Sequence, residues 1–389
     1  YQKRSIYWML DKEKKNYSLS FNVNNELIFG DVHYDVISRT LNFDKDRKKL
    51  VFNGGALIDE VGLGKTIQTA TLSLLNPANN LSYTRKNEKK LFSRATLILC
   101  PNQLCGQWKR EIENRIKKSE DVTIISLLTK THYKKYTYQD LLDADFVIVS
   151  YSFIDNRAFL DPWINHLSTS KSYHKSQQFN RNEANRILED MGSMLVKDPT
   201  IILQPEPQLL LINWHRIIVD EMHEIYTLPK YSFMGNILPL FKSQYKWAVS
   251  GTPFNKESSC LPNMLEFATD YQNTYGDRIF ISNQIQKHML TNFFRRNTNK
   301  SRLEEYKLPP LKESVIWLNF TRTERMMYQS FATNRNNKID DLFLRQLCCH
   351  PKIAEETKDL LSKCKTLEDI ETMMVTHYRN AMEKANKKV

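Results

Sequence analysis

A short apolar run, a glycine-containing loop and an amphipathic segment follow one another between residues 53 and 75, and this order limits the possible folds more than any other stretch. The apolar run at 56–58 predicts a buried strand. Beyond the loop, apolar residues recur at helical spacing until Pro77, which cannot continue a helix. The stretch therefore predicts a strand, a tight polar loop and a helix, in that order.

The loop at 62–66 reads GLGKT. Such a loop turns backbone N–H groups inward as a cradle for phosphate oxygens, and glycine keeps the approach open. In this interpretation Lys65 reaches the β- and γ-phosphates and the Thr66 hydroxyl ligates Mg²⁺. The strict consensus begins with glycine, whereas this sequence has Asp59 there. A phosphate-binding loop is still favoured over a simple glycine-rich turn, because strand, loop and helix come in the right order.

A strand predicted from Trp214 ends in a second apolar run, at 217–219, that leads directly into Asp220 and Glu221. Two adjacent carboxylates at the end of a buried strand are costly unless they meet a cation. Asp220 is therefore expected to hold Mg²⁺ through its water shell, and Glu221 to orient or deprotonate an attacking water. His223 follows them, and it either relays the state of the γ-phosphate or is simply a hydrogen-bonded buried histidine.

Ser250, Gly251 and Thr252 end a further strand that is predicted at 246–250. Hydroxyl groups beside a glycine at this place can hydrogen-bond the carboxylate pair and sense hydrolysis, although the same residues also make an ordinary turn. Buried strands are also predicted at 95–100, 122–128 and 146–150. Strand, crossover and strand repeated around the loop predict a doubly wound α/β lobe with a mostly parallel sheet.

Basic residues outnumber acidic ones, 56 to 44, which gives the 389-residue chain a net charge of +12. This favours a polyanionic partner such as nucleic acid, although a solvated basic surface explains it too. The six cysteines include no C-x-x-C pair, which argues against a disulfide framework or zinc module and fits a reducing intracellular compartment. No apolar run approaches the roughly 18 residues of a membrane span, so no membrane partner is expected.

The length of the chain suits two or three domains. We expect a first lobe over residues 1–290 and an α-helical protrusion over 291–389. A polar stretch at about 155–210 is expected to form a surface insertion that is helical near 181–196. Further predicted segments are a helix at 1–15, β-like strands at 17–50, a basic loop at 83–94, a strand at 315–320, and helices at 321–332, 340–348 and 367–389.

Six segments, in order, resemble the Swi/Snf-type ATPases of helicase superfamily 2. They are YQKRSIYWMLDKE (the Q-motif helix), GGALIDEVGLGKTIQ (motif I), LILCPNQLCGQWKREI (motif Ia), FVIVSYSFI (motif Ib), VDEMH (motif II) and SGTPF (motif III). Motif I of this family usually carries aspartate where the general consensus has glycine, which accounts for Asp59. The long interruption before motif II and the later CCHP look closest to the SHPRH-like branch, which is similar to ubiquitin ligases.

The resemblance implies a RecA-like P-loop NTPase lobe that uses ATP and Mg²⁺. The implied ATP-binding residues are Gln2, which reads adenine, and Gly62, Leu63, Gly64, Lys65 and Thr66. The implied catalytic residues are Lys65, Asp220 and Glu221, with Thr66 and Asp220 as metal ligands. The residues implied to couple hydrolysis to movement are His223, Ser250, Gly251 and Thr252. The residues implied to face DNA are Pro101, Gln107, Lys109, Arg110 and Tyr151.

The function implied is an ATP-dependent translocase on double-stranded DNA, inside the nucleus, a viral replication site or the cytoplasm. Motifs IV to VI and their arginine fingers are not in the sequence, and Tyr1 is not an initiator Met. We therefore expect a second RecA-like lobe beyond Val389 and very weak ATP hydrolysis by residues 1–389 alone. Two alternatives stay open: a strand-separating DNA or RNA helicase, and a nucleotide-binding scaffold that works with chromatin or ubiquitin machinery.

Overall fold

The computed structural model divides the chain into two compact units, Tyr1–Leu308 and Pro309–Val389. The residues that it describes are 1–15, 17–21, 26–29, 32–35, 40–42, 48–78, 90–115, 122–156, 181–228, 232–253, 260–269, 287, 289–302, 305, 312–332, 341–349, 364 and 366–386.

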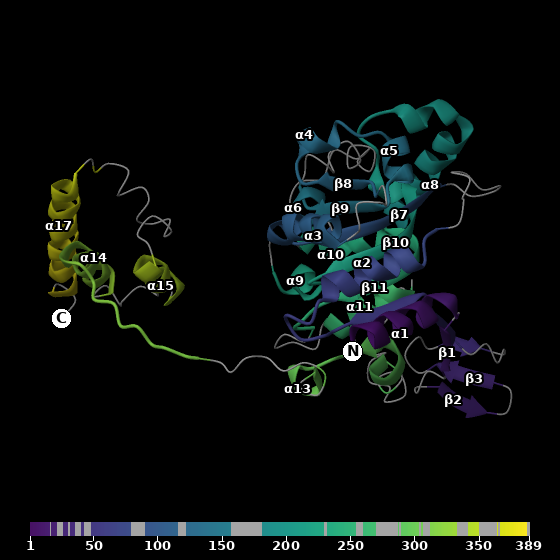
Figure 1. Ribbon diagram of the computed structural model, residues 1–389, viewed down its shortest axis with the longest axis horizontal. Helices are drawn as coiled ribbons and strands as arrows, with labels where there is room; N and C mark the ends of the chain where they lie inside the picture. Colours follow the sequence, from purple (N-terminus) through teal and green to yellow (C-terminus); the bar gives the residue numbers. More distant parts are fainter. Residues whose placement is uncertain are drawn as a thin grey trace. The chain divides into compact units, whose positions relative to one another are not determined.

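The first unit is built on a seven-stranded sheet in the order β12-β6-β11-β10-β7-β9-β8, and each pairing described in it is parallel (Figure 1). Its strands are β6 (Gly54–Leu57), β7 (Leu91–Cys100), β8 (Ile124–Leu127), β9 (Phe146–Ser150), β10 (Ile212–Asp220), β11 (Lys242–Val249) and β12 (Phe294–Arg295). The strands are apolar along most of their length because both faces of the sheet are covered. The predicted α/β class with a mostly parallel sheet is confirmed.

Alternate residues of the central strands enter two separate cores, as the pleat of a strand requires. Ile98 and Ile218 pack with Met9, Ala70 and Trp108, which come from three helices that cover one face. These helices are α1 (Gln2–Lys14), α2 (Lys65–Leu75) and α3 (Asn102–Arg115). The larger core covers the other face, with α4 (Lys130–Tyr133), α5 (Tyr138–Asp143), α6 (Tyr151–Ile154), α8 (Arg181–Lys197), α9 (His223–Thr227), α10 (Ser232–Ile237) and α11 (Cys260–Thr269).

A buried ion pair fixes α1 against the sheet. The Arg216 guanidinium donates from Nε and a terminal nitrogen to the two carboxylate oxygens of Glu13, each at 2.6 Å, and both side chains are fully buried. Trp247 and Asn76 also donate to Glu13, at 2.9 and 2.7 Å. The carboxylate is thus saturated with donors, which a buried charge requires. The network holds the helix whose first residue is Gln2.

The described residues between 17 and 52 form short antiparallel strands, as the β-like pattern at 17–50 predicts. Strand β1 (Tyr17–Phe21) pairs with β5 (Lys48–Phe52), and a separate three-stranded sheet contains β2 (Glu26–Phe29), β3 (Val32–Asp35) and β4 (Thr40–Asn42). The predicted helix of the insertion is also confirmed, as α8. Its Ala184, Leu188 and Leu195 are buried in the larger core. This part of the insertion therefore packs onto the sheet instead of standing on the surface.

The second unit contains α14 (Arg322–Ala332), α15 (Asp341–Cys349) and α17 (Leu367–Asn386), close to their predicted bounds. Met327, Phe331, Phe343, Leu347 and Met374 form its small core. The strand predicted at 315–320 is wrong: no described strand pairs with this stretch, and Trp317 within it is 90% exposed. An apolar run makes a strand only where a neighbouring strand supplies hydrogen-bond partners.

Three other expectations differ from the structure. Strand β7 begins at Leu91, so it includes the end of the basic loop predicted at 83–94, of which residues 83–89 lie outside the described residues. Strand β12 has only two residues and was not predicted. The compact units divide after Leu308 instead of at 290, because Phe294 pairs with Ala56 of β6 and Asn297 hydrogen-bonds Asp59 in the loop before α2.

Candidate functional site

A cavity of about 640 Å³ lies at the carboxyl ends of the central strands, where ligands bind in open parallel sheets. Four segments that are distant in the sequence line it: the start of α1, the loop before α2, one face of α3 and the end of β10. The predicted residues that line it are Gln2, Gly62, Gly64, Lys65, Thr66, Gln107, Asp220 and Glu221. The structure therefore brings most of the predicted nucleotide and metal residues into one cavity.

The glycines of the loop have backbone conformations that other residues rarely adopt. Gly62 and Gly64 have φ angles of 83° and 74°, in the left-handed region. A Cβ atom on Gly64 would lie 2.5 Å from Nε2 of Gln2, so a larger residue here would displace the Gln2 amide. The Gln2 amide donates to the carbonyl of Leu63 at 3.2 Å. Gln2 is thus seated directly against the loop, as the first residue of α1.

Lys65 is the first residue of α2, and its ammonium group donates to the loop carbonyls of Asp59 (3.0 Å) and Glu60 (3.4 Å). A Cβ atom on Gly251 would lie 3.3 Å from this ammonium nitrogen. The lysine therefore reaches back across the loop toward the end of β11. The Leu63 side chain, by contrast, is fully buried. Its backbone carbonyl accepts hydrogen bonds from the side-chain amides of Gln2 and Gln68.

Asp59, the departure from the general consensus, is fully buried and holds the loop in place. One carboxylate oxygen accepts from the backbone N–H (2.6 Å) and the side-chain amide (2.8 Å) of Asn297. The other accepts from the amide of Gln68 at 3.1 Å. Sequence reasoning missed both Asn297 and Gln68. The signal that could have led to them was the aspartate itself, because a buried carboxylate must find donors.

Asp220 ends β10 and is almost fully buried. Its Oδ2 atom accepts from the indole Nε1 of Trp108 at 2.7 Å, and its Oδ1 atom accepts from the backbone N–H of Glu221 at 3.0 Å. Burial raises the pKa of the Asp220 carboxyl to about 6, against the opposing hydrogen bond from Trp108. Because the Asp220 carboxylate has little contact with water, a cation in the cavity would stabilise its charged form.

Glu221 has a φ angle of 51°, which is rare for a residue with a side chain. Its carboxylate accepts from the Ser250 hydroxyl at 3.0 Å and lies 3.3 Å from Nδ1 of His223. Burial opposes ionisation, but the nearby His223 and the hydrogen bond from Ser250 outweigh it and hold the pKa of Glu221 below its usual value. Glu221 is therefore ionised at neutral pH.

The four residues predicted to couple hydrolysis to movement lie together beside Glu221. Ser250 gives its one proton to Glu221, so Nδ1 of His223, at 2.9 Å, must donate to the serine oxygen. The other ring nitrogen of His223 lies 3.4 Å from the Thr252 hydroxyl. His223 therefore links the carboxylate to the end of β11, and this geometry fits both interpretations of the histidine.

The residues predicted to face DNA are only partly placed for it. Lys109 and Arg110 are exposed on α3, and Gln107 is exposed at the rim of the cavity. Pro101 and Tyr151 are buried, and the Tyr151 hydroxyl donates to the backbone carbonyl of Asp220. A direct contact of these two side chains with DNA was therefore a wrong prediction. Tyr151 packs behind the carboxylate pair instead.

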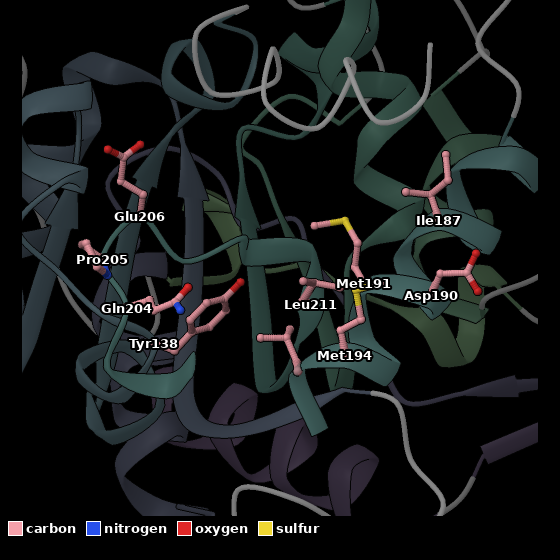
Figure 2. A pocket seen from close by; sticks show the side chains of 10 residues that line it. Tyr138, Ile187, Asp190, Met191, Met194, Gln204, Pro205, Glu206 and Leu211 are labelled. Carbon is pink, nitrogen blue, oxygen red and sulfur yellow. The ribbon is translucent and has the colours of Figure 1, made fainter. Parts of the chain in front are cut away.

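A second cavity, of about 460 Å³, lies between α8, α5 and the segment at 204–206 (Figure 2). Its lining is mainly apolar, with Met191 and Met194 on α8 and Tyr138 opposite them, and Asp190 and Glu206 lie at its edge. It shares no lining residue with the first cavity. It offers neither a glycine-rich loop nor paired buried carboxylates, so it is not a candidate for phosphate chemistry.

The comparison with protein families identifies the chain. The model of the SNF2-related domain matches residues 1–353. The chain belongs to this family. The predicted resemblance to the Swi/Snf-type ATPases is therefore confirmed. No helix in the described part of the chain combines the length and apolar character that a membrane span requires.

Individual proteins similar to the chain include the E3 ubiquitin-protein ligase SHPRH of Mus musculus (22% identity over 85% of this chain and 21% of that protein). The DNA repair protein RAD5 of Saccharomyces cerevisiae is 22% identical over 81% of this chain and 29% of that protein. A solved structure of the Sulfolobus solfataricus SWI2/SNF2 ATPase core with dsDNA is 18% identical, with a TM-score of 0.44, over 99% of this chain and 64% of that one. The chain spans less than a third of the length of these two curated relatives.

Proposed function

We propose that this SNF2-related chain is the ATP-binding lobe of an ATPase that moves along double-stranded DNA. The observation that supports this most is that Lys65 and Thr66 line the same cavity as Asp220 and Glu221. More than 150 positions in the sequence separate the first pair from the second. Family membership supports the same conclusion. The relatives named as DNA repair protein and ubiquitin ligase support a role on DNA inside the cell, in the nucleus.

The residues present fit ATP with Mg²⁺. The open left-handed turn at Gly62, with no atom within 4 Å of an added Cβ, leaves room for phosphate oxygens. Thr66 and Asp220 would hold the metal with the oxygen ligands that Mg²⁺ prefers. No three His, Cys, Asp or Glu side chains gather into a metal site among the described residues, which suits an ion that keeps several waters. When bound, Mg²⁺ neutralises charge on the β- and γ-phosphates.

In this proposal the protein residues divide the work of hydrolysis. Lys65 leaves the loop carbonyls to bind the β- and γ-phosphates. Ionised Glu221 orients the attacking water and accepts its proton. Ser250 and His223 hold that carboxylate, so a change in its charge is felt at the end of β11. Gln2, seated against the loop, reads the adenine.

The second RecA-like lobe is proposed to supply the arginine fingers from outside residues 1–389 and to close on the nucleotide. Closure and reopening move the pair of lobes only if the γ-phosphate contacts differ between the two states. Exposed Lys109 and Arg110 on α3 are proposed to contact DNA through its phosphates, because translocation must tolerate any sequence. Association with chromatin or ubiquitin machinery is a further proposal, which the similarity to SHPRH supports.

The test is the substitution Lys65→Ala in the full-length protein, with ATP hydrolysis measured with and without DNA. We expect loss of nucleotide binding or hydrolysis, because the variant lacks the ammonium group that is proposed to bind the β- and γ-phosphates. The wild-type rate should rise with double-stranded DNA. Normal DNA-stimulated hydrolysis by the variant would overturn the proposal. Stimulation by single strands alone would favour a strand-separating helicase, and no hydrolysis by the wild-type protein would favour a nucleotide-binding scaffold.

A further inference from the structure

We propose that Trp108 is a positioning residue of the magnesium site, because its indole N–H fixes the Asp220 carboxylate and ties that carboxylate to helix α3. The inference rests on the proposed function, since it assigns a partner to the carboxylate that would hold Mg²⁺. It adds α3 to a site that otherwise consists of the phosphate loop and the end of β10.

The first support is the geometry around Asp220. The bond from Trp108 to Oδ2 is 2.7 Å long, and the indole is only 1% exposed, so the ring cannot turn away without opening the core. Oδ1 is held separately by the backbone N–H of Glu221. Each oxygen thus has one donor within the protein and a second lone pair left for the cavity. The plane of the carboxylate is therefore set by the protein before a cation binds.

The second support comes from the other fully buried tryptophans in the described part of the chain. Trp214 donates its N–H to the Leu209 carbonyl at 3.3 Å, and Trp247 donates to Glu13. Both acceptors lie outside the cavity, whereas the acceptor of Trp108 lines it, as Trp108 itself does. A buried indole needs only an acceptor, which is a backbone carbonyl for Trp214 and a carboxylate outside the cavity for Trp247. Among these three tryptophans, Trp108 is the one whose acceptor is the carboxylate proposed to hold the metal.

The third support is the position of α3. The helix presents Gln107, Trp108 and Glu111 to the cavity and exposes Lys109 and Arg110. Gln107 also donates to Glu111 at 2.7 Å, which stiffens the cavity face of the helix. A ligand that displaces the exposed face of α3 would therefore move Asp220 through one rigid side chain. Trp108 gives DNA bound at α3 a direct route to the magnesium site.

The experiment compares Trp108→Phe with Trp214→Phe in the full-length protein. Both remove a buried indole N–H, but Trp214 lies at the opposite end of β10 from Asp220, so its variant is the matched control. Binding of a fluorescent ATP analogue is measured across a Mg²⁺ titration and in EDTA. For Trp108→Phe we expect half-maximal binding to need about 10–100-fold more Mg²⁺, with unchanged affinity in EDTA. For Trp214→Phe we expect no change in either.

An equal loss of affinity with Mg²⁺ and in EDTA would overturn the inference, because it would show a purely structural role. An unchanged Mg²⁺ requirement in Trp108→Phe would overturn it as well. If the wild-type protein does not bind the analogue at all, the proposed function itself fails, which is a different result. Should Trp108→Phe not fold, 3-benzothienylalanine at position 108 keeps the ring shape and lacks only the N–H. It should raise the Mg²⁺ requirement in the same way, and an unchanged requirement would overturn the inference.

Discussion

The polar and the apolar cavity described above each have a glutamate with a left-handed backbone at their edge: Glu221 (φ 51°) in the polar cavity and Glu206 (φ 59°) in the apolar one. Among the described residues these are the two non-glycine positions with positive φ. Their surroundings differ. The Glu221 carboxylate accepts a hydrogen bond from Ser250 and lies beside the His223 ring. Glu206 is exposed, and its carboxylate lies 3.6 Å from Nζ of Lys134. Backbone strain alone therefore does not identify a reactive site, and the partners of the side chain do.

The walls of the two cavities also differ. The polar one is held by buried hydrogen bonds, of which Asp59 accepts three. The apolar one, seen in Figure 2, is held mainly by packing of Leu195 and Leu211 into the core. Substitutions in the polar wall should therefore change both stability and function, whereas substitutions in the apolar wall should change stability alone.

The sharpest test of this contrast is a pair of charge-removing substitutions. Glu221→Gln in the full-length protein should lower the rate of ATP hydrolysis by about 10²–10⁴-fold and leave ATP binding intact, because it removes the proton acceptor but not the phosphate contacts. Glu206→Gln, the matched control with the same backbone conformation, should leave the rate unchanged. Equal effects of the two substitutions on the steady-state rate of hydrolysis would contradict the claim that the two glutamates differ in function.

Asp59→Ala tests the polar wall. It removes the acceptor of the buried Asn297 backbone N–H and one of the acceptors of the Asn297 and Gln68 side-chain amides, so we expect the free energy of unfolding to fall by about 3 kcal/mol and ATP binding to weaken. Chemical denaturation and nucleotide titration measure the two effects. Asp59→Asn, which keeps one acceptor oxygen, should be milder in both. A variant that is destabilised but binds ATP normally would show that the loop needs no such anchor.

Leu195→Ala tests the apolar wall. The side chain is buried in the larger core, and its removal should lower the free energy of unfolding by about 2 kcal/mol, at the low end for leucine because it borders an existing cavity. ATP hydrolysis at a temperature where the variant stays folded should equal that of the wild type. A specific loss of hydrolysis would mean that the two cavities are coupled.

Glu206→Gly should have the smallest effect. Glycine relieves the left-handed strain but gains freedom in the unfolded chain and loses the surface pair with Lys134, so we expect a net gain of about 0.5 kcal/mol in unfolding free energy. Urea denaturation is the measurement. A loss of stability would show that the glutamate side chain, not the backbone, decides this position.

Much of the polar cavity could be predicted from the sequence because its residues stand next to strong periodic signals. The loop at 62–66 and the pair Asp220–Glu221 each follow a buried strand, and the carboxyl ends of parallel strands share one edge. Strand β9 has its predicted bounds for the same reason: FVIVS is uniformly buried.

The parts that could not be predicted depend on contacts across long distances. Asn297 and Trp108 meet the two aspartates of the site only after the sheet has formed, and nothing next to them in the sequence marks these acceptors. The prediction that Tyr151 faces DNA failed for the opposite reason. Its position directly after a strand places it at the carboxyl edge of the sheet, but it does not show in which direction the ring points. Strand β12 is too short for any periodicity to reveal it.

The central claim is that one triphosphate binds Lys65 and Thr66 while its magnesium lies near Asp220. A crystal structure of the full-length protein with Mg²⁺ and a non-hydrolysable ATP analogue tests it most directly. The account predicts phosphate density against the 62–66 loop, with the metal bound by the Thr66 hydroxyl and bridged to Asp220 by water. A nucleotide bound elsewhere, or a metal held without Thr66 and Asp220, would contradict it.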